Sequence, residues 1–336
     1  MAISSVLGSS ALLPAGLGFR NVLINGGFDV WQRGTTAAFT TTASTSFLAD
    51  RWSGYRGAAG STQSRISAGL DGFQYAMRVQ RDSGNTSVFR QYIGTSLETS
   101  TTTKLANKPV VLSFYARAGA NYSSASNGLN VLLYSGTGTE ANGVHVNFTS
   151  ATSVVNTVAT LTTSYQRFTY FATMPATSSQ MLVQFDFAGV GTAGANDYFD
   201  ITGVQLEQNY QPTPFEQRPI GVELALCQRY YVNLVSGTSK ALGTAYMSGT
   251  TTWEAAINFP TYMRTAPTLA YVTGAQYYGV YMLAIEQRVD SMTLDFATPS
   301  ACRVYGAIVG ATSTNGVAGI LYTRNASAFL SVQAEL

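Results

Sequence analysis

The sequence has little charge. Charged residues make up 11% of its 336 residues, against about 25% in an average globular domain. Lysine and arginine total 19, aspartate and glutamate total 17, and the formal net charge is +2. This balance excludes binding to nucleic acid or to an anionic membrane through bulk charge. Because 46% of the residues are hydrophobic, the low charge does not indicate disorder, and the chain has enough apolar material for a core.

Cysteine and histidine are nearly absent. Two cysteines, Cys227 and Cys302, cannot form a disulfide framework, and their spacing matches no zinc motif. They are free to pair, but we interpret them as small buried hydrophobic residues. The single histidine, His145, excludes a multi-histidine metal site. It lies in GVHVNF, whose alternation predicts a structural place in a strand.

Long apolar runs are also missing. No stretch reaches 18 apolar residues, so the sequence predicts no membrane insertion. The first 18 residues lack a basic start and are broken by glycines and Pro14, so no signal peptide is predicted. We interpret residues 1–20 as an arm that cannot fold alone.

What the sequence does contain is alternation with a period of two. Short segments rich in β-branched and aromatic residues are bounded by Gly, Ser, Asn or Pro clusters, which is typical of strands and turns. The clearest are 109–117, 129–134, 166–174, 180–188 and 198–206. Many short strands with almost no helical periodicity predict an all-β protein built as a β-sandwich or jelly roll.

A break in this pattern falls at 209–220, where three prolines in eight residues end strand pairing. The segment 221–231 is the best helix candidate, with Val222, Leu226 and Tyr230 on one face. We therefore expect an N-terminal jelly-roll domain over 21–208, a Pro-rich linker over 209–220, and a smaller β-rich domain over 221–336 that begins with one short helix.

Motifs for catalysis are missing. The sequence holds no Walker loop, no Cys/His cluster and no nucleophile elbow. The glycine-rich run 189–194 follows a strand without opening a helix. Several aspartates are candidates for a glycosidase pair, but the sequence alone does not show which two carboxylates lie at the separation that catalysis requires. We predict that the protein is not an enzyme and has no cofactor, apart from a structural Ca²⁺ for which Asn25, Asp29 and Asp200 are the candidate ligands.

Aromatic side chains offer another chemistry, because their flat faces can stack on the C–H faces of sugar rings. The wider set is Trp31, Trp52, Tyr55, Tyr92, Tyr115, Tyr122 and Trp253, of which we interpret Trp31 and Trp52 as core residues. The run Tyr277, Tyr278 and Tyr281 is equally open to a core or an exposed position. The predicted glycan-binding residues are Tyr55, Tyr122, Tyr277, Tyr278 and Tyr281.

Several long segments together carry a family resemblance. They are RNVLINGGFDVWQRG (20–34), ADRW (49–52), FQYAMRVQR (73–81), LSFYARAGANYS (112–123), AGANDYFDITGVQLE (193–207), TPFEQRP (213–219) and ELALCQRYY (223–231). Over about 20–231 the chain resembles a family of bacteriophage and prophage virion proteins, described as tail-fibre or minor structural proteins with a jelly roll similar to carbohydrate-binding modules. The later FPTYMRTAPT (259–268) resembles a segment of C-terminal tip domains in such proteins.

The resemblance implies a non-enzymatic component of the virion, assembled in the host cytoplasm. The arm over 1–20 would dock to other virion proteins, and the jelly roll would form the body of the protein. The C-terminal domain would lie far from the particle or would mediate oligomerisation. Fibres of this kind are commonly trimers, and a trimer would cover sheet edges and explain a surface with few charges.

Two functions remain open at this point, and a third is less favoured. The first is a tail fibre that recognises surface polysaccharide of the host through exposed aromatic and amide side chains. The alternative is a capsid decoration protein that stabilises the head without binding a receptor. A depolymerase would need two carboxylates that converge in a groove.

Overall fold

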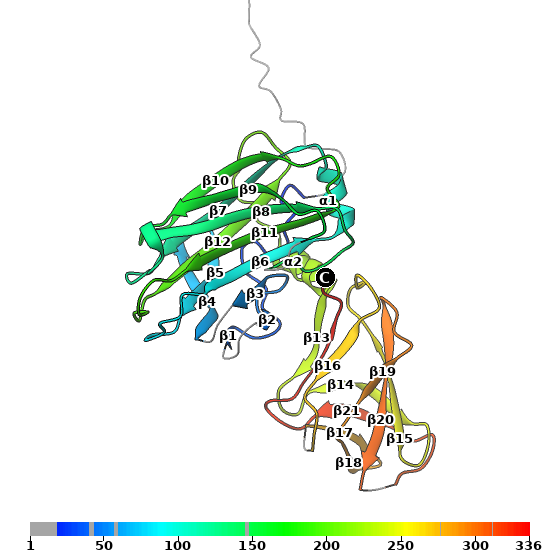
Figure 1. Cartoon of the computed structure of the whole chain (residues 1–336). Helices are drawn as coiled ribbons and strands as arrows, with labels where there is room; N and C mark the ends of the chain where they lie inside the picture. The colour runs from blue at the N-terminus through cyan, green and yellow to red at the C-terminus, as the bar shows by residue number, and fades with distance from the viewer. Residues whose placement is uncertain (1–18, 40–43, 57–59, 145–147, 276, 311) are drawn as a thin grey trace, which may run out of the picture.

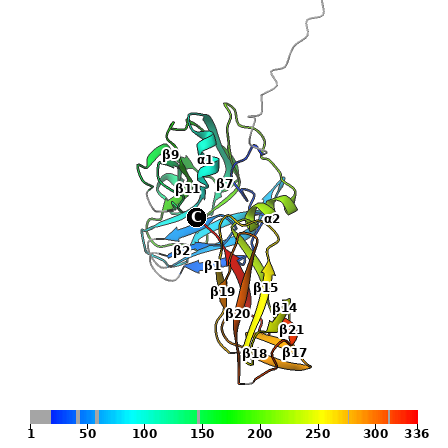
Figure 2. The ribbon, with the colours of Figure 1, turned by 90° about the vertical axis from the view of Figure 1, so that its right-hand side faces the viewer.

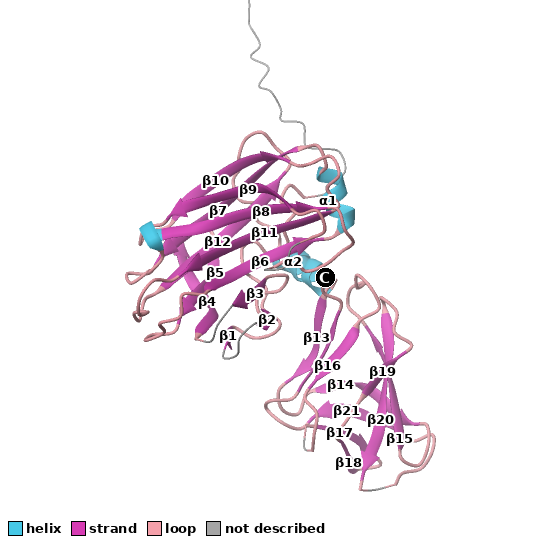
Figure 3. Ribbon diagram, in the orientation of Figure 1, coloured by secondary structure: helices cyan, strands magenta, loops and turns pink. Residues whose placement is uncertain are grey.

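The computed structural model describes residues 19–39, 44–56, 60–144, 148–275, 277–310 and 312–336. Within these residues the chain is nearly all β, so the predicted fold class is confirmed (Figure 1, Figure 3). None of the described helices is long and apolar enough to cross a membrane. His145 and residues 1–18 of the predicted arm lie outside the described residues.

The N-terminal part of the chain is a β-sandwich of jelly-roll type, made of two six-stranded antiparallel sheets. Sheet A has the order β1 (Thr36–Phe39), β4 (Ser61–Leu70), β5 (Phe73–Arg81), β12 (Tyr198–Glu207), β7 (Pro109–Ala118) and β10 (Gln166–Thr173). Sheet B has the order β2 (Ser44–Phe47), β3 (Ser53–Arg56), β6 (Arg90–Leu97), β11 (Gln180–Ala188), β8 (Gly128–Gly136) and β9 (Thr152–Thr160). A helix α1 (Thr99–Leu105) and a 3₁₀ turn η1 (Ala125–Asn127) lie in the connections.

The inner faces of both sheets form one hydrophobic core, because alternate residues along each strand point to the same side. The rings of Phe114 in β7 and Phe185 in β11 meet edge to face with centroids 4.7 Å apart. Phe187 and Phe199 make a second edge-to-face contact at 5.7 Å. Trp52 is completely buried beside them in the same core, as expected for a core residue. The residues left on the outer faces are free for other roles.

Strand β12 contains a bulge that changes which residues face the core. Its register with β7 shifts between Thr202 and Gln205. Gly203, at φ +60°, supplies the left-handed backbone conformation that this irregularity needs. As a result Ile201 before the bulge and Val204 after it are both fully buried in the core.

The proline-rich segment after β12 lies against the sandwich. The backbone N–H of Glu216 donates to Gln205 Oε1 at 2.8 Å, and the Glu216 carboxylate accepts from the backbone of Arg20 and Asn21 at 3.0 and 3.1 Å. Helix α2 (Ile220–Gln228) follows.

The short helix was predicted, but the prediction of its buried face is wrong. Val222 is 37% exposed, whereas Glu223 and Cys227 are buried. Glu223 is drawn inward because Arg218 donates to it at 3.2 Å and the Asn25 backbone donates to it as well. Polar contacts therefore overrode the apolar pattern along this helix.

The C-terminal part contains two further sheets. A three-stranded sheet has the order β13 (Tyr231–Ser236), β22 (Phe329–Gln333) and β16 (Thr268–Tyr271). A seven-stranded sheet has the order β15 (Thr252–Asn258), β14 (Ala241–Met247), β21 (Ala318–Thr323), β17 (Tyr278–Met282), β18 (Ile285–Val289), β20 (Ala301–Val309) and β19 (Thr293–Asp295). Pairing between β15 and β20 closes six of these strands into a barrel.

The core of the C-terminal part is built around Trp253, which is completely buried, and includes Cys302. Cys227 is buried at the other side of the junction, in α2. Both cysteines are free, which confirms their interpretation as buried unpaired residues.

The two parts lie end to end (Figure 1, Figure 2), and ion pairs connect them. Arg33 pairs with Glu335 at 2.9 Å, Arg229 with Glu98 at 2.8 Å, and Arg264 with Glu140 at 2.7 Å. Each pair joins a residue of the sandwich to a residue beyond α2. The chain's last residues thereby hold the C-terminal part against one end of the sandwich.

Candidate functional site

The outer face of sheet B carries three aligned rows of side chains. In register, Tyr55, Tyr92, Asp186 and Asn130 lie side by side across β3, β6, β11 and β8. In the next row Gln184 of β11 pairs with Leu132 of β8, and in the row after it Leu182 pairs with Tyr134. Strand alternation fixes this arrangement, because Val183 and Phe185 between these residues belong to the core.

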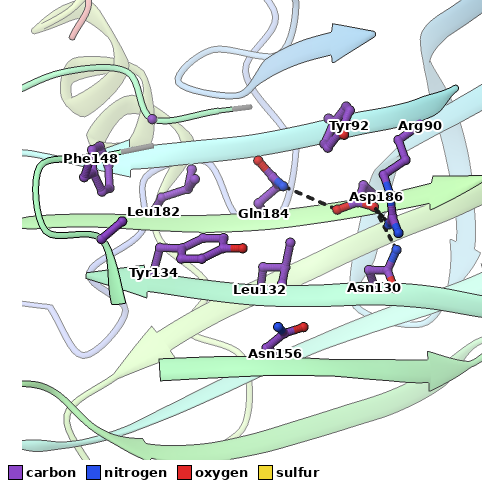
Figure 4. Close-up of a pocket in the computed structure, with 12 residues that line it drawn as sticks. Arg90, Tyr92, Asn130, Leu132, Tyr134, Phe148, Asn156, Leu182, Gln184 and Asp186 are labelled. Atoms are coloured by element: carbon purple, nitrogen blue, oxygen red, sulfur yellow. Dashed lines mark hydrogen bonds and ion pairs between the residues drawn. The ribbon is translucent and has the colours of Figure 1, made fainter. Parts of the chain in front are cut away.

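These rows form the floor of a groove of about 330 Å³ (Figure 4). Its lining residues are Arg90, Tyr92, Asn130, Leu132, Tyr134, Gly143, Phe148, Ala151, Asn156, Leu182, Gln184 and Asp186. Most of them come from the neighbouring strands β6, β11, β8 and β9, and Figure 4 shows Phe148 at one end, on a loop. The volume lies at the low end of the roughly 300–1,000 Å³ typical of small-molecule sites.

One end of the groove is apolar. Phe148 and Leu182 form a small buried cluster with Val144, and Tyr92 and Tyr134 pack against it. This cluster holds the two tyrosine rings in the lining of the groove, where they are half-buried. The rings therefore present partly exposed faces in fixed positions.

The other end is polar and centres on Asp186, which is 1% exposed. Its carboxylate accepts hydrogen bonds from Asn130 Nδ2 at 2.8 Å and Gln184 Nε2 at 3.3 Å, and it forms an ion pair with Arg90. Arg90 and Asp186 are the only charged residues among those that line the described groove. Since they pair with each other, the groove is close to neutral.

Tyr92 remains uncharged at every physiological pH. Burial, and secondarily the negative charge of Asp186, raise the pKa of its hydroxyl to about 12. Its ring also meets the half-buried ring of Tyr55 edge to face, with centroids 5.6 Å apart. The Tyr92 hydroxyl is thus a neutral polar group beside an aromatic surface.

Together these groups suit a ligand that is apolar on its faces and hydroxylated at its edges. Tyrosine rings can contact apolar C–H surface, while Asn130 and Asn156 add amide groups to the lining. Hydrolysis of a glycosidic bond would need two carboxylates across the groove. Asp186 is the one carboxylate among the described lining residues, and it is already paired with Arg90.

The predicted glycan-binding residues are scattered. Tyr55 lies beside the groove, next to Tyr92. Tyr281 is 49% exposed on β17, opposite Ile320 of β21, and Tyr277 is half-buried against the second core. All but Tyr55 lie away from the groove.

Two of the predicted residues are buried and present no ring face. Tyr122 is 8% exposed, its hydroxyl donates to Gly128 O at 3.0 Å, and its ring lies 4.9 Å from that of Phe187. Tyr278 is 1% exposed; its hydroxyl donates to Phe329 O and accepts from the Val272 N–H at 3.2 Å. Each hydroxyl has a backbone partner, which is what allows these tyrosines to be core residues.

The candidate calcium ligands do not form a site. Asp200 is occupied by Arg78 and Arg117, each with a contact of 2.8 Å. The Asn25 oxygen instead accepts from the backbone N–H groups of Asp29 and Val30, at 2.9 and 3.0 Å. Burial, and secondarily Glu223, raise the pKa of Asp29. Among the residues that the structure describes, no group of three or more Asp, Glu, His or Cys side chains is placed to hold a metal ion.

Tyr134, Asn130 and Gln184 were missed by the sequence analysis, whereas Tyr92 belonged to its wider aromatic set. A signal existed, because the alternation of 180–188 assigns Val183 and Phe185 to one face and leaves Leu182, Gln184 and Asp186 on the other. What the pattern could not supply was the strand order that places β6, β11 and β8 next to one another.

No family model matches this chain, and no curated protein matches it. Solved structures similar to it include one described as "CBM4 structure and function", at TM-score 0.30 and 16% identity, covering 55% of this chain and 98% of that one. The CBM22-1 xylan-binding domain of Paenibacillus barcinonensis Xyn10C has TM-score 0.33 and 12% identity, over 50% and 97% of the two chains.

A third similar structure is the enzymatically active domain of tailspike protein 4 from bacteriophage CBA120. Its TM-score is 0.32 and its identity 8%, over 56% of this chain and 22% of that one. At these TM-scores the likeness is loose, and it identifies neither a ligand nor a partner for this chain.

Proposed function

We propose that the groove on sheet B binds an uncharged glycan and that the protein is a non-catalytic glycan-binding protein. One observation carries this proposal: the rings of Tyr92 and Tyr134 line the same groove as a polar group of side chains whose charges cancel. Sugar rings need both, since their C–H faces pack on aromatic rings and their hydroxyls need donors and acceptors. The Arg90–Asp186 pair leaves no net charge to attract an acidic sugar.

The sequence resemblance over about 20–231 supports a proposal for where the protein acts. We propose a virion structural protein, a tail fibre whose sandwich contacts host surface polysaccharide. In this proposal the arm over 1–20 docks to other virion proteins. The C-terminal part self-associates, as a trimer, and Tyr281 beside Ile320 supplies exposed apolar surface for such a contact.

Titration of the full chain with neutral oligosaccharides tests the groove. A suitable panel holds xylohexaose, cellohexaose and β-1,4-linked galactose oligomers, with oligogalacturonate as the acidic comparison. We expect at least one neutral oligomer to bind, and we expect Tyr92→Ala and Tyr134→Ala each to weaken its binding tenfold or more, which corresponds to about 1.4 kcal/mol.

Two variants serve as controls for that titration. Tyr92→Phe keeps the ring and should stay within threefold of the original affinity. Tyr210→Ala removes a tyrosine that is 76% exposed and does not line the groove, and it should change nothing. Neutral glycan binding at β6, β8 and β11 that survives both groove alanines would contradict the proposal, whereas binding elsewhere on the chain would not.

Position on the particle separates the tail fibre from a capsid decoration protein. Electron microscopy of intact virions labelled with an antibody to this chain should show label on the tail. Label distributed over the head, together with particles that burst more easily when the protein is missing, would instead favour decoration.

A further inference from the structure

A second pocket, of about 510 Å³, lies where the sandwich meets the C-terminal part. One wall comes from residues 32–34 and from Ser46 and Phe47 of β2, and the other comes from β13, β16 and β22. It shares no lining residue with the groove on sheet B. A ligand here would touch both parts of the chain at once.

The walls of this junction pocket are fixed by contacts across it. Gln32 Nε2 donates to Tyr231 O at 2.8 Å and to Asp50 Oδ2 at 3.0 Å. The Arg33 guanidinium lies 3.6 Å from the centroid of the Tyr231 ring and pairs with Glu335 at 2.9 Å. Because both walls are held before any ligand arrives, binding would cost little ordering of side chains.

The charges around the junction pocket cancel. Arg33 pairs with Asp50 and Glu335, and Glu335 also pairs with Arg51. Two guanidinium groups thus balance two carboxylates, and the remaining polar lining consists of amides and hydroxyls. An uncharged ligand fits this balance better than an ionic one.

The lining also combines ring surface with hydroxyl-binding groups. Phe47 and Phe329 are half-buried, and Gln333 and Ser236 are exposed. The Asn233 side chain, also in the lining, donates from Nδ2 to Gln32 O and to Ser236 Oγ, at 3.4 and 3.3 Å.

We infer that the junction pocket is a second carbohydrate site, which binds a neutral sugar between Phe47 of the sandwich and Phe329 of the C-terminal part. Its occupant would extend the contact of the chain with a polysaccharide beyond the groove on sheet B. Two sites on one chain would raise the avidity for a long polymer over that for a short oligomer.

Photolabelling of the full chain tests this inference. The probe is a neutral hexasaccharide from the panel above that carries a diazirine group, and labelled peptides are mapped by mass spectrometry. The double variant Tyr92→Ala/Tyr134→Ala removes the groove. In that variant we expect labelling of the peptides that contain Phe47 and Phe329–Gln333 to persist.

A matched pair of substitutions then fills or spares the pocket. Ser236→Trp places a large ring into it from an exposed position, and it should reduce the junction labelling at least tenfold. Ser83→Trp, at an exposed position that does not line the junction pocket, should leave the labelling unchanged.

The outcomes separate this inference from the proposed function. Labels confined to β6, β8 and β11 in the unaltered chain would overturn the second site and leave the groove standing. Labels confined to the junction would overturn the groove and support the second site. Junction labelling that Ser236→Trp does not reduce, or a cross-link from residues 1–18 showing that the chain's own arm fills the pocket, would overturn the inference.

Discussion

The two outer faces of the sandwich are built around the same element, a buried aspartate, and differ in what surrounds it. On sheet A, Asp200 accepts three charge-assisted hydrogen bonds from Arg78 and Arg117. Tyrosine rings lie over those guanidiniums. The Cζ atom of Arg78 is 3.4 Å from the centroid of the Tyr198 ring, and that of Arg117 is 4.6 Å from the centroid of the Tyr165 ring. The flat cations and rings stack over the carboxylate.

On sheet B, Asp186 has one arginine and two amides as its donors. Tyr92 and Tyr134 line a hollow beside these donors instead of covering the carboxylate. The comparison teaches that the kind of donor around a buried carboxylate decides whether a sheet face is filled or open to a ligand.

The largest effect on stability should come from removing the Asp200 carboxylate on sheet A. Asp200→Ala leaves two arginines without their shared partner, and we expect it to lower the free energy of unfolding by about 3 kcal/mol. Urea denaturation measures this difference. Asp71→Ala, at an exposed aspartate in the turn between β4 and β5, is the control and should change it by less than about 0.5 kcal/mol. Equal effects of the two would show that the Asp200 cluster does not stabilise sheet A.

A further buried aspartate shows what happens when burial outweighs the hydrogen bonds and the ion pair of the carboxylate. Asp50 is 1% exposed and shares Arg33 with Glu335. Burial, only partly offset by Arg33 and Gln32, raises the pKa of its carboxyl from 3.8 to about 6. The folded state therefore holds a proton between these pH values that the unfolded state has lost, and stability falls as pH rises through this range.

We expect the fall between about pH 4 and pH 6 to amount to about 2 kcal/mol, since each unit of pKa shift corresponds to 1.36 kcal/mol. Asp50→Asn should flatten this part of the stability profile, measured by urea denaturation at several pH values. Asp71→Asn should leave the slope unchanged. A slope that persists in the Asp50 variant would assign it to another group.

The smallest effect should be a change of ligand preference at sheet B. Asp186→Asn keeps the shape of the side chain but leaves the Arg90 charge unpaired, so the groove becomes positive. We expect binding of oligogalacturonate to strengthen about fivefold at low salt, or about 1 kcal/mol, and to weaken again as salt is added. Titration of both oligosaccharide classes measures this, and an unchanged preference would show that the Arg90–Asp186 pair does not select for neutral ligands.

Much of the fold could be predicted from the sequence, because alternation is a local property. The segment 109–117 corresponds to β7 (Pro109–Ala118), and 180–188 corresponds to β11 (Gln180–Ala188). Trp52 in the core and the burial of the two cysteines followed from residue type alone. These features depend on burial preferences that each residue carries with it.

The site could be predicted only in part, because it depends on contacts between distant segments. Tyr122 and Tyr92 look alike in sequence, yet one hydroxyl reaches a backbone carbonyl in the core and the other lies at a groove. Likewise Asp200 qualifies as a calcium ligand until Arg78, 122 positions earlier, is placed beside it. Which of two similar residues faces a ligand is decided by sheet order, and sheet order is not a local property.

The bulge in β12 has a consequence for how this protein can evolve. The single extra residue around Gly203 changes which positions of the strand face the core. Odd-numbered positions point inward before it and even-numbered positions point inward after it. Loss of that one residue would rotate one half of β12, bringing Asp200 and Thr202 toward the aromatic interior or turning Val204 and Leu206 out to water. A loop tolerates the insertion or deletion of one residue, but here such a change would turn the apolar side chains of one half of β12 away from the core. The bulge at Gly203 keeps the apolar side chains of both halves on the core side.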